Sequence, residues 1–194
     1  MDVAVNRIDD VAVVALSGDI DGSTAPVAQT SILGQLAAGE GVVLDMTRKA
    51  DGESVEVGDV EAALKAIGYT LKPLDIVLVR TGRDAFYGQP DYVLRGCAVS
   101  PESTHWLFDR GVRVMGIDAW GWDGPLDRQA REALARQEPG VFWAAHQCDL
   151  AYSQIERLVN LGSLPPVGFQ VACFPLKIRG GSAGPAWVVA ILPG

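Results

Sequence analysis

The stretch Gly39–Ser54, GEGVVLDMTRKADGES, decides the fold because a buried strand lies in its first half. Val42, Val43 and Leu44 form a short apolar run between a glycine pair and Asp45, which predicts a buried strand. The second half is polar, and its Asp-Gly pair at 51–52 is typical of a turn. The residues before this strand and the residues after it follow different patterns, so two kinds of sequence meet here.

Composition restricts the classes of protein to which the chain can belong. Its 194 residues suit one domain, or one domain with a fragment of another, and 48% hydrophobic residues are enough for a packed core. A net charge of -8, with lysines and arginines scattered singly, argues against nucleic acid and anionic membranes as partners. No apolar run reaches the roughly 20 residues of a membrane span, and no secretory signal is recognisable. We therefore expect a cytoplasmic protein.

The scarce residues exclude further kinds of site. Cys97, Cys148 and Cys173 are widely spaced and form no C-x-x-C pair, so they predict buried free thiols rather than a disulfide framework or a zinc knuckle. The chain has only two histidines, His105 and His146. A site that needs three imidazoles from one chain is therefore excluded.

Strands and helices alternate along the chain, which indicates an α/β or α+β class. Ser100-Pro101-Glu102 is typical of a helix start, because it combines a capping serine, a proline in the first turn and an acidic residue. A long loop is expected at 83–97, and a helical pattern runs through Ile155, Leu158 and Val159. The predicted strands are 11–16, 42–46, 76–79, 112–117, 169–178 and 187–192, and the predicted helices are 24–38, 57–67, 100–110 and 126–137, with Asp59 as the cap of the second helix.

The first 46 residues, through VAVVALSGDID, TAP and VVLDMT, resemble the front half of a STAS domain, the fold of anti-anti-sigma factors. The resemblance implies a strand, loop, helix and strand, and a module switched by phosphorylation of a serine at a helix start. The D-S-S-G-like turn that carries this serine in the family is absent. Ser54 lies nearby in another context and is expected to be a solvated loop serine.

The chain from about Gly41 onward resembles the cyclase-like, metal-dependent hydrolases, which include kynurenine formamidases and isatin hydrolases. The segments KADGESVEVGDVEAAL, LKPLDIVLVRTG, SPESTHWLFDRGVRVMGIDAWGWD, HQCDLAYSQIERLVNLGSLPP and FQVACFPLKIRGGSAGPAWVVAIL carry this resemblance in the family's order. It implies a swivelling β/β/α fold for the body at 47–194, assembly as a homodimer or higher oligomer, and hydrolysis of a non-peptide C–N bond in a cyclic or aryl amide by a bound zinc or manganese ion.

Two segments build the metal site in that family, and this sequence matches only the second. His146 and Glu156 match its histidine and glutamate by context, in WAAHQ and QIERLVNL. The amino-terminal H-x-G-T-H-x-D-x-P motif, with its imidazoles and carboxylate, is absent, and His105 matches nothing catalytic. A catalytic metal site takes at least three protein ligands, to which Asp118 or Asp123 could add. We therefore assign no catalytic residue and expect the metal to bind weakly or not at all and hydrolysis to be weak or absent.

The aromatic residues in the predicted loops do not decide where a substrate binds. Trp120, Trp122, Phe86 and Tyr87 either line a pocket for an aromatic amide or cover the core, and burial in the core is the favoured alternative.

Two further functions stay open at this point: a STAS-type regulatory or interaction module, and a chimeric scaffold without catalysis. In the chimeric hypothesis GEGVVLDMTRKADGES is the crossover between the two parents, and the crossover removes the activating motif of each.

Overall fold

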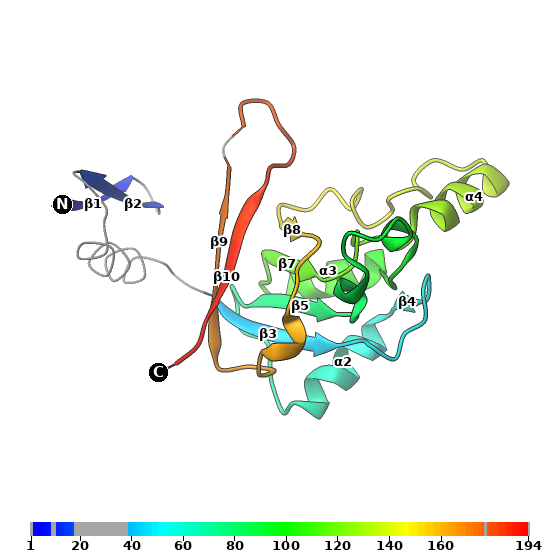
Figure 1. Cartoon of the computed structure of the whole chain (residues 1–194), viewed down its shortest axis with the longest axis horizontal. Coiled ribbons are helices and arrows are strands. Elements are labelled where there is room, and N and C mark those ends of the chain that lie inside the picture. The colour runs from blue at the N-terminus through cyan, green and yellow to red at the C-terminus, as the bar shows by residue number, and fades with distance from the viewer. Residues whose placement is uncertain (1, 9–10, 18–38, 177, 194) are drawn as a thin grey trace. The chain divides into compact units, whose positions relative to one another are not determined.

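The strand predicted from the opening stretch, β3 (Glu40–Asp45), lies inside a six-stranded sheet of the computed structural model, whose strand order is β10-β9-β3-β5-β7-β8 (Figure 1). β3 runs parallel to β5 (Ile76–Arg80), which runs parallel to β7 (Val114–Ile117), and β7 runs parallel to β8 (Ser153–Ile155). Four consecutive residues of β3, from Gly41 to Leu44, are buried. This continuous apolar run is what a parallel strand covered on both faces requires.

The structure describes residues 2–8, 11–17, 39–176 and 178–193, and its contacts divide the chain into the units Met1–Ala38 and Gly39–Gly194. In the first unit, β1 (Asp2–Ile8) and β2 (Val11–Ser17) pair as an antiparallel hairpin. The helix predicted at 24–38 falls outside the described residues. β3 belongs to the sheet of the second unit, although the sequence-based division after residue 46 grouped it with the first. None of the described helices has the length and apolar character needed to cross a membrane.

Alternate residues of the central strands face two different cores, because side chains along a strand point to opposite sides of the sheet. Helices α2 (Val57–Ala66) and α3 (Pro101–Asp109) contribute to the first core, and β9 (Phe169–Pro175) contributes to the second. The first core includes Val42, Leu44, Val77, Val79, Val60, Leu64 and Leu107, and the second contains Val43, Ile76, Leu78, Leu161, Phe169 and Val171.

The helix starts follow capping chemistry. The predicted start of α3 is confirmed, since Ser100 Oγ accepts a hydrogen bond from Ser103 N at 3.0 Å and Pro101 opens the helix. Asp59, the predicted cap of α2, is instead the third residue of the helix. Glu56 is the N-cap residue, and its backbone N–H donates to Asp59 Oδ2 at 2.8 Å. Asp59 therefore completes a capping box from inside the first turn.

One prediction of secondary structure in the second unit was wrong. The helical pattern near residue 155 is instead β8, followed by the short 3-10 helix η3 (Leu161–Ser163). Arg157 and Asn160 have φ values of 62° and 63°, a left-handed conformation that an α-helix cannot contain. The loop expected at 83–97 holds two 3-10 helices, η1 (Arg83–Phe86) and η2 (Tyr92–Leu94), and is followed by β6 (Ala98–Val99), which pairs with β4 (Ser54–Val55).

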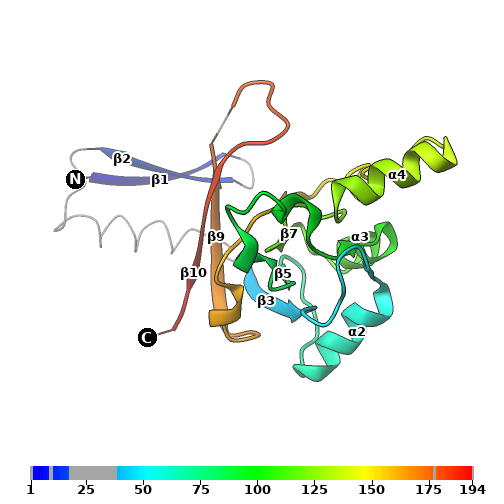
Figure 2. The same ribbon diagram turned by 45° about the vertical axis from the view of Figure 1, so that its right-hand side comes forward.

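At the other edge of the sheet, β9 pairs antiparallel with β3 and with β10 (Ala186–Ile191). The contact with β3 requires a glycine, because a Cβ at Gly41 would lie 2.2 Å from the Phe169 ring. After this contact β9 and β10 extend beyond β3 as a two-stranded ribbon (Figures 1 and 2). The helix α4 (Leu126–Arg136) contributes no buried side chain.

Candidate active site

The sequence-predicted polar residues gather where the parallel strands end. Asp118 follows β7 directly, Glu156 follows β8 directly, and Asp123 lies in the segment between β7 and α4. The carboxyl edge of parallel strands is where open α/β sheets bind their ligands. The site is therefore built on the strands of the sheet and on the segments that follow them.

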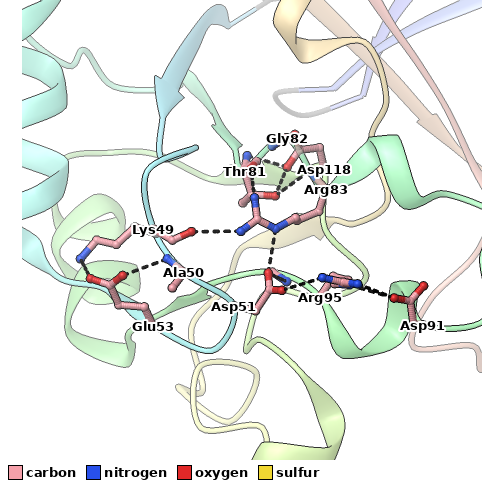
Figure 3. Close-up of polar contacts among 11 residues, drawn as sticks. Lys49, Ala50, Asp51, Glu53, Thr81, Gly82, Arg83, Asp91, Arg95 and Asp118 are labelled. Atoms are coloured by element: carbon pink, nitrogen blue, oxygen red, sulfur yellow. Dashed lines mark hydrogen bonds and ion pairs between the residues drawn. The ribbon is translucent and has the colours of Figure 1, made fainter.

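Asp118 is a structural carboxylate. Its side chain is buried and accepts hydrogen bonds from Thr81 N at 2.7 Å, Thr81 Oγ1 at 2.6 Å and Gly82 N at 2.8 Å (Figure 3). Burial raises the pKa of Asp118, and the bonds from Thr81 and Gly82 oppose that rise. These three bonds join the end of β5 to the end of β7, so the carboxylate holds the two strand ends together.

The turn of the opening stretch is held by a second carboxylate. Asp51 Oδ1 accepts from Arg83 Nε at 2.7 Å and from Gly96 N at 3.0 Å, and its other oxygen lies 3.4 Å from Arg95 Nη1 (Figure 3). Gly52 has a φ of 75°, which is typical of a glycine in a turn. The predicted turn is confirmed, and these contacts tie it to the 3-10 helices that follow β5.

His146 lies between two carboxylates. Its Nδ1 forms a short contact with Asp123 Oδ2, and its Nε2 lies 3.5 Å from Glu156 Oε1. The hydrogen bond to Asp123 raises the pKa of His146; burial opposes this rise, and the negative charges of Asp123 and Glu156 add to it. The imidazole side chain is 36% exposed and the Asp123 side chain is 6% exposed, so a buried carboxylate orients a ring that a ligand can reach.

Backbone donors fix both carboxylates. Asp123 Oδ1 accepts from Ala145 N at 2.6 Å, and Glu156 Oε1 accepts from Trp122 N at 3.0 Å. Trp122 itself is fully buried, and its Nε1 donates to Thr104 Oγ1 at 3.0 Å. The segment after β7 is thus anchored by one tryptophan, and the carboxylates on either side of His146 have fixed positions.

The segment that carries His146 is held by further contacts. Tyr152 Oη donates to Ala145 O at 3.0 Å and accepts from the amide of Gln154, and the Trp143 ring stacks on the imidazole with centroids 5.5 Å apart. Five of the six non-glycine residues with positive φ among the described residues lie between 137 and 160. Such backbone is energetically costly and concentrates at functional sites. Sequence reasoning missed these contacts, because they join residues without a shared motif.

The described residues do not complete a metal site. His146 Nε2 and Glu156 Oε1 face each other and could share a cation, but Asp123 occupies the opposite nitrogen of the same ring. No group of three or more histidine, cysteine, aspartate or glutamate side chains in the described part of the chain is arranged to hold a metal ion. Asp123 fits the role of the carboxylate that orients a metal-binding imidazole. The arrangement therefore offers two ligands and one orienting group, fewer than the three ligands of a catalytic zinc site.

The other sequence candidates lie elsewhere in the fold. His105 is exposed on α3. Ser54 was expected to be a solvated loop serine, but it is partly buried in β4, where its carbonyl accepts from Lys49 Nζ at 2.9 Å. Cys97 is buried, which raises the pKa of its thiol to about 11, whereas Cys148 and Cys173 are only partly buried. The four aromatic residues divide: Trp122 is buried, Tyr87 is exposed, and Phe86 and Trp120 are partly buried.

Comparisons with known proteins agree on the body of the chain. A family model described as "Putative cyclase" matches residues 20–124, a range that begins within the segment resembling STAS domains. The structure of isatin hydrolase A from Labrenzia aggregata is similar with a TM-score of 0.66 at 22% identity, covering 81% of this chain and 64% of that one. Isatin hydrolase A from Ralstonia solanacearum gives 0.66 at 22%, covering 82% and 63%. A potential metal-dependent hydrolase with cyclase activity gives 0.51 at 17%, covering 97% and 85%.

The likeness to these structures shows the fold, and the chain spans less than two thirds of the length of either isatin hydrolase. The STAS-like segment and the kynurenine formamidase type remain predictions. The family model, in contrast, matches more than half of the chain. The chain therefore belongs to the cyclase family.

Proposed function

We propose that the chain has a weakened hydrolase site, which takes a C–N bond of a cyclic or aryl amide as its substrate and turns it over slowly at most. The observation that carries the proposal is the position of His146 between Asp123 and Glu156, with only one ring nitrogen directed toward a second metal ligand. Membership of the cyclase family and hydrolases of the same fold support the reaction class. The small number of ligands supports weak turnover.

The chain's own residues would prepare the site for a cation in two ways. Asp123 accepts the proton of Nδ1, which leaves Nε2 as the nitrogen that binds, and Trp122 N holds the Glu156 carboxylate beside it. A zinc or manganese ion, when bound, lowers the pKa of a water molecule and polarises an amide carbonyl. With two ligands we infer weak and reversible binding of either metal.

Metal content and hydrolysis test this proposal together. Zinc and manganese are measured by mass spectrometry after dialysis and by calorimetric titration, and isatin ring opening is followed by absorbance with and without added metal. The variants are His146→Ala and Glu156→Gln, and His105→Ala is the matched control because it removes the other imidazole from an exposed position. We expect the metal to be lost on dialysis, and both site variants to weaken the remaining binding while His105→Ala does not.

Tightly bound, stoichiometric metal with fast turnover that His146→Ala abolishes would overturn the weak-site proposal and show that further ligands exist. Equal metal binding by wild type and both site variants would overturn the assignment of His146 and Glu156. Phosphorylation near Ser54, or binding to an anti-sigma kinase, would instead support the STAS-type module. A folded chain without any of these activities would support the chimeric scaffold.

A further inference from the structure

Arg157 places a guanidinium beside the candidate site. Its Cζ lies 3.7 Å from the centroid of the Trp120 ring, and its Nε donates to Trp120 O at 3.5 Å. Arg157 is exposed, and among the described residues it forms no ion pair with a carboxylate and its two Nη groups have no hydrogen-bond partner. An aromatic ring therefore holds this cation in place, while its outer donors are open to a ligand.

Three consecutive residues connect this guanidinium to the carboxylate that faces the imidazole. Trp120 carries the guanidinium of Arg157, and Trp122 N donates to Glu156 Oε1 at 3.0 Å. Between them, a Cβ at Gly121 would lie 3.5 Å from the same Glu156 oxygen. The cation and the carboxylate therefore lie along one short segment, at the edge of the sheet where open α/β proteins bind ligands.

The backbone at Arg157 has an energetically costly conformation. Its φ of 62° is left-handed, which glycine adopts readily and residues with a Cβ rarely do. Two hydrogen bonds hold the chain there, from Arg157 N to Ala119 O and from Leu158 N to Ile117 O, both at 3.0 Å. Such conformations concentrate at functional sites, and here the residue that adopts one is the arginine.

The Trp120 ring is itself fixed. The buried Tyr92 ring meets it edge-on, with centroids 6.1 Å apart, and Tyr92 Oη donates to Asp118 O at 2.9 Å. Burial and the charge of Asp118 raise the pKa of Tyr92 to about 12, and the positive charge of Arg157 opposes that rise. The guanidinium therefore rests on a preformed support, which lowers the entropic cost of binding an anion.

An exposed aromatic surface lies on the imidazole side of the site. Trp143 is 46% exposed, and its ring stacks on that of His146. Glu156 lies between this pair and Arg157, since its Oε1 is 3.5 Å from His146 Nε2 and the next residue in the chain is the arginine. The site thus offers a cation at one end and aromatic rings at the other.

We propose that Arg157 is the anion-recognition residue of this site and binds the carboxylate of a small aromatic carboxylate. The assignment rests on the proposed function, because hydrolysis of an amide C–N bond yields an amine and a carboxylic acid, which is ionised at neutral pH. A planar guanidinium can donate two parallel N–H bonds to such a group. Asp123 and Glu156 repel an anion, and Arg157 offsets this repulsion.

Fluorescence titration of metal-free protein with anthranilate tests the proposal, with the uncharged anthranilamide as the comparison ligand. We expect wild type to bind anthranilate at least about 10-fold more tightly than anthranilamide. Arg157→Gln should lose this preference, and Arg157→Lys should keep part of it because the charge remains without the planar fork.

Arg110→Gln is the matched control. The Arg110 guanidinium also stacks on a tryptophan, with its Cζ 3.4 Å from the Trp106 ring centroid, and its Nη1 donates to Trp106 O at 3.1 Å. It lies at the end of α3, where it is no part of the candidate site, so this variant should keep the preference for anthranilate. Circular dichroism checks that each variant is folded.

Wild type that binds anthranilate no better than anthranilamide, or not at all, overturns the proposal. An unchanged preference in Arg157→Gln, or the same loss in Arg110→Gln, overturns it as well. The titration needs neither metal nor turnover, so its failure differs from failure of the proposed function. Isatin hydrolysis together with an unchanged preference in Arg157→Gln would refute the role of Arg157 alone, and loss of the preference in a chain without hydrolysis would support that role alone.

Discussion

Asp118 and Asp123 lie in the same segment after β7, and both side chains have little contact with solvent, yet their partners differ. Asp118 accepts from Thr81 and Gly82, whose donors do not titrate near neutral pH. Asp123 accepts from Ala145 N and contacts the imidazole of His146, which does titrate there. The comparison shows that burial alone does not identify a functional carboxylate, whereas the chemistry of its partners does.

The largest effect is expected from Asp118→Ala. This change leaves the Thr81 and Gly82 donors buried without an acceptor, and it should lower the free energy of unfolding by about 3 kcal/mol. Urea denaturation followed by circular dichroism measures the loss. Asp109→Ala, at an exposed position on α3, should change stability by about 0.5 kcal/mol or less. Equal losses in the two variants would show that Asp118 does not hold the strand ends together.

A smaller effect is expected from Tyr152→Phe, which changes the segment that holds Asp123 in place. It removes the hydrogen bond to Ala145 O and should lower the free energy of unfolding by about 1 kcal/mol. Ala145 N donates to Asp123, so the loss of this bond should loosen the carboxylate that orients His146. We therefore expect the affinity for metal to fall by about 10-fold, which is more than the loss of stability alone would explain. Calorimetric titration with zinc measures this, and Tyr87→Phe, at an exposed tyrosine, is the control. Unchanged zinc affinity in Tyr152→Phe would show that the hydrogen bond from Tyr152 to Ala145 does not support the metal-binding residues.

The smallest effect concerns pH. The pKa of His146 is raised in the folded chain, so its protonated form contributes stability that is fully present below the unfolded pKa of about 6.5 and is lost as pH rises through the folded pKa. In metal-free protein, wild type should therefore exceed His146→Gln in stability more at about pH 5.5 than at about pH 9. Denaturation at the two pH values measures the difference. A gap that widens toward alkaline pH would contradict the predicted direction.

Sequence reasoning located those parts of the fold that depend on local chemistry. The start of α3 was predictable because Ser100 and Pro101 act within one turn, and β3 was predictable from its buried apolar run. Ile155 and Leu158 have helical spacing but belong to β8 and the turn after it, because the backbone of Arg157 and contacts from distant segments decide their conformation. Spacing alone cannot distinguish these two outcomes.

The site was predictable only in part, because the roles of its carboxylates depend on contacts between residues that are distant in the sequence. His146 and Glu156 were identified from a family resemblance, and the structure brings them to 3.5 Å. Asp123 was only one of two carboxylates that could assist, and nothing in the sequence separates it from Asp118. Their roles depend on which donors the folded chain brings to each, and those donors are distant in sequence.

The pairing of β3 with β9 also determines when this strand can acquire its second neighbour. β5 follows β3 closely in the sequence, but Phe169 and Gln170 are synthesised about 130 residues after Gly41. During translation, one side of β3 therefore waits for nearly the whole body of the protein to emerge from the ribosome. An apolar strand in that position is a target for chaperones and for unintended pairing between nascent chains.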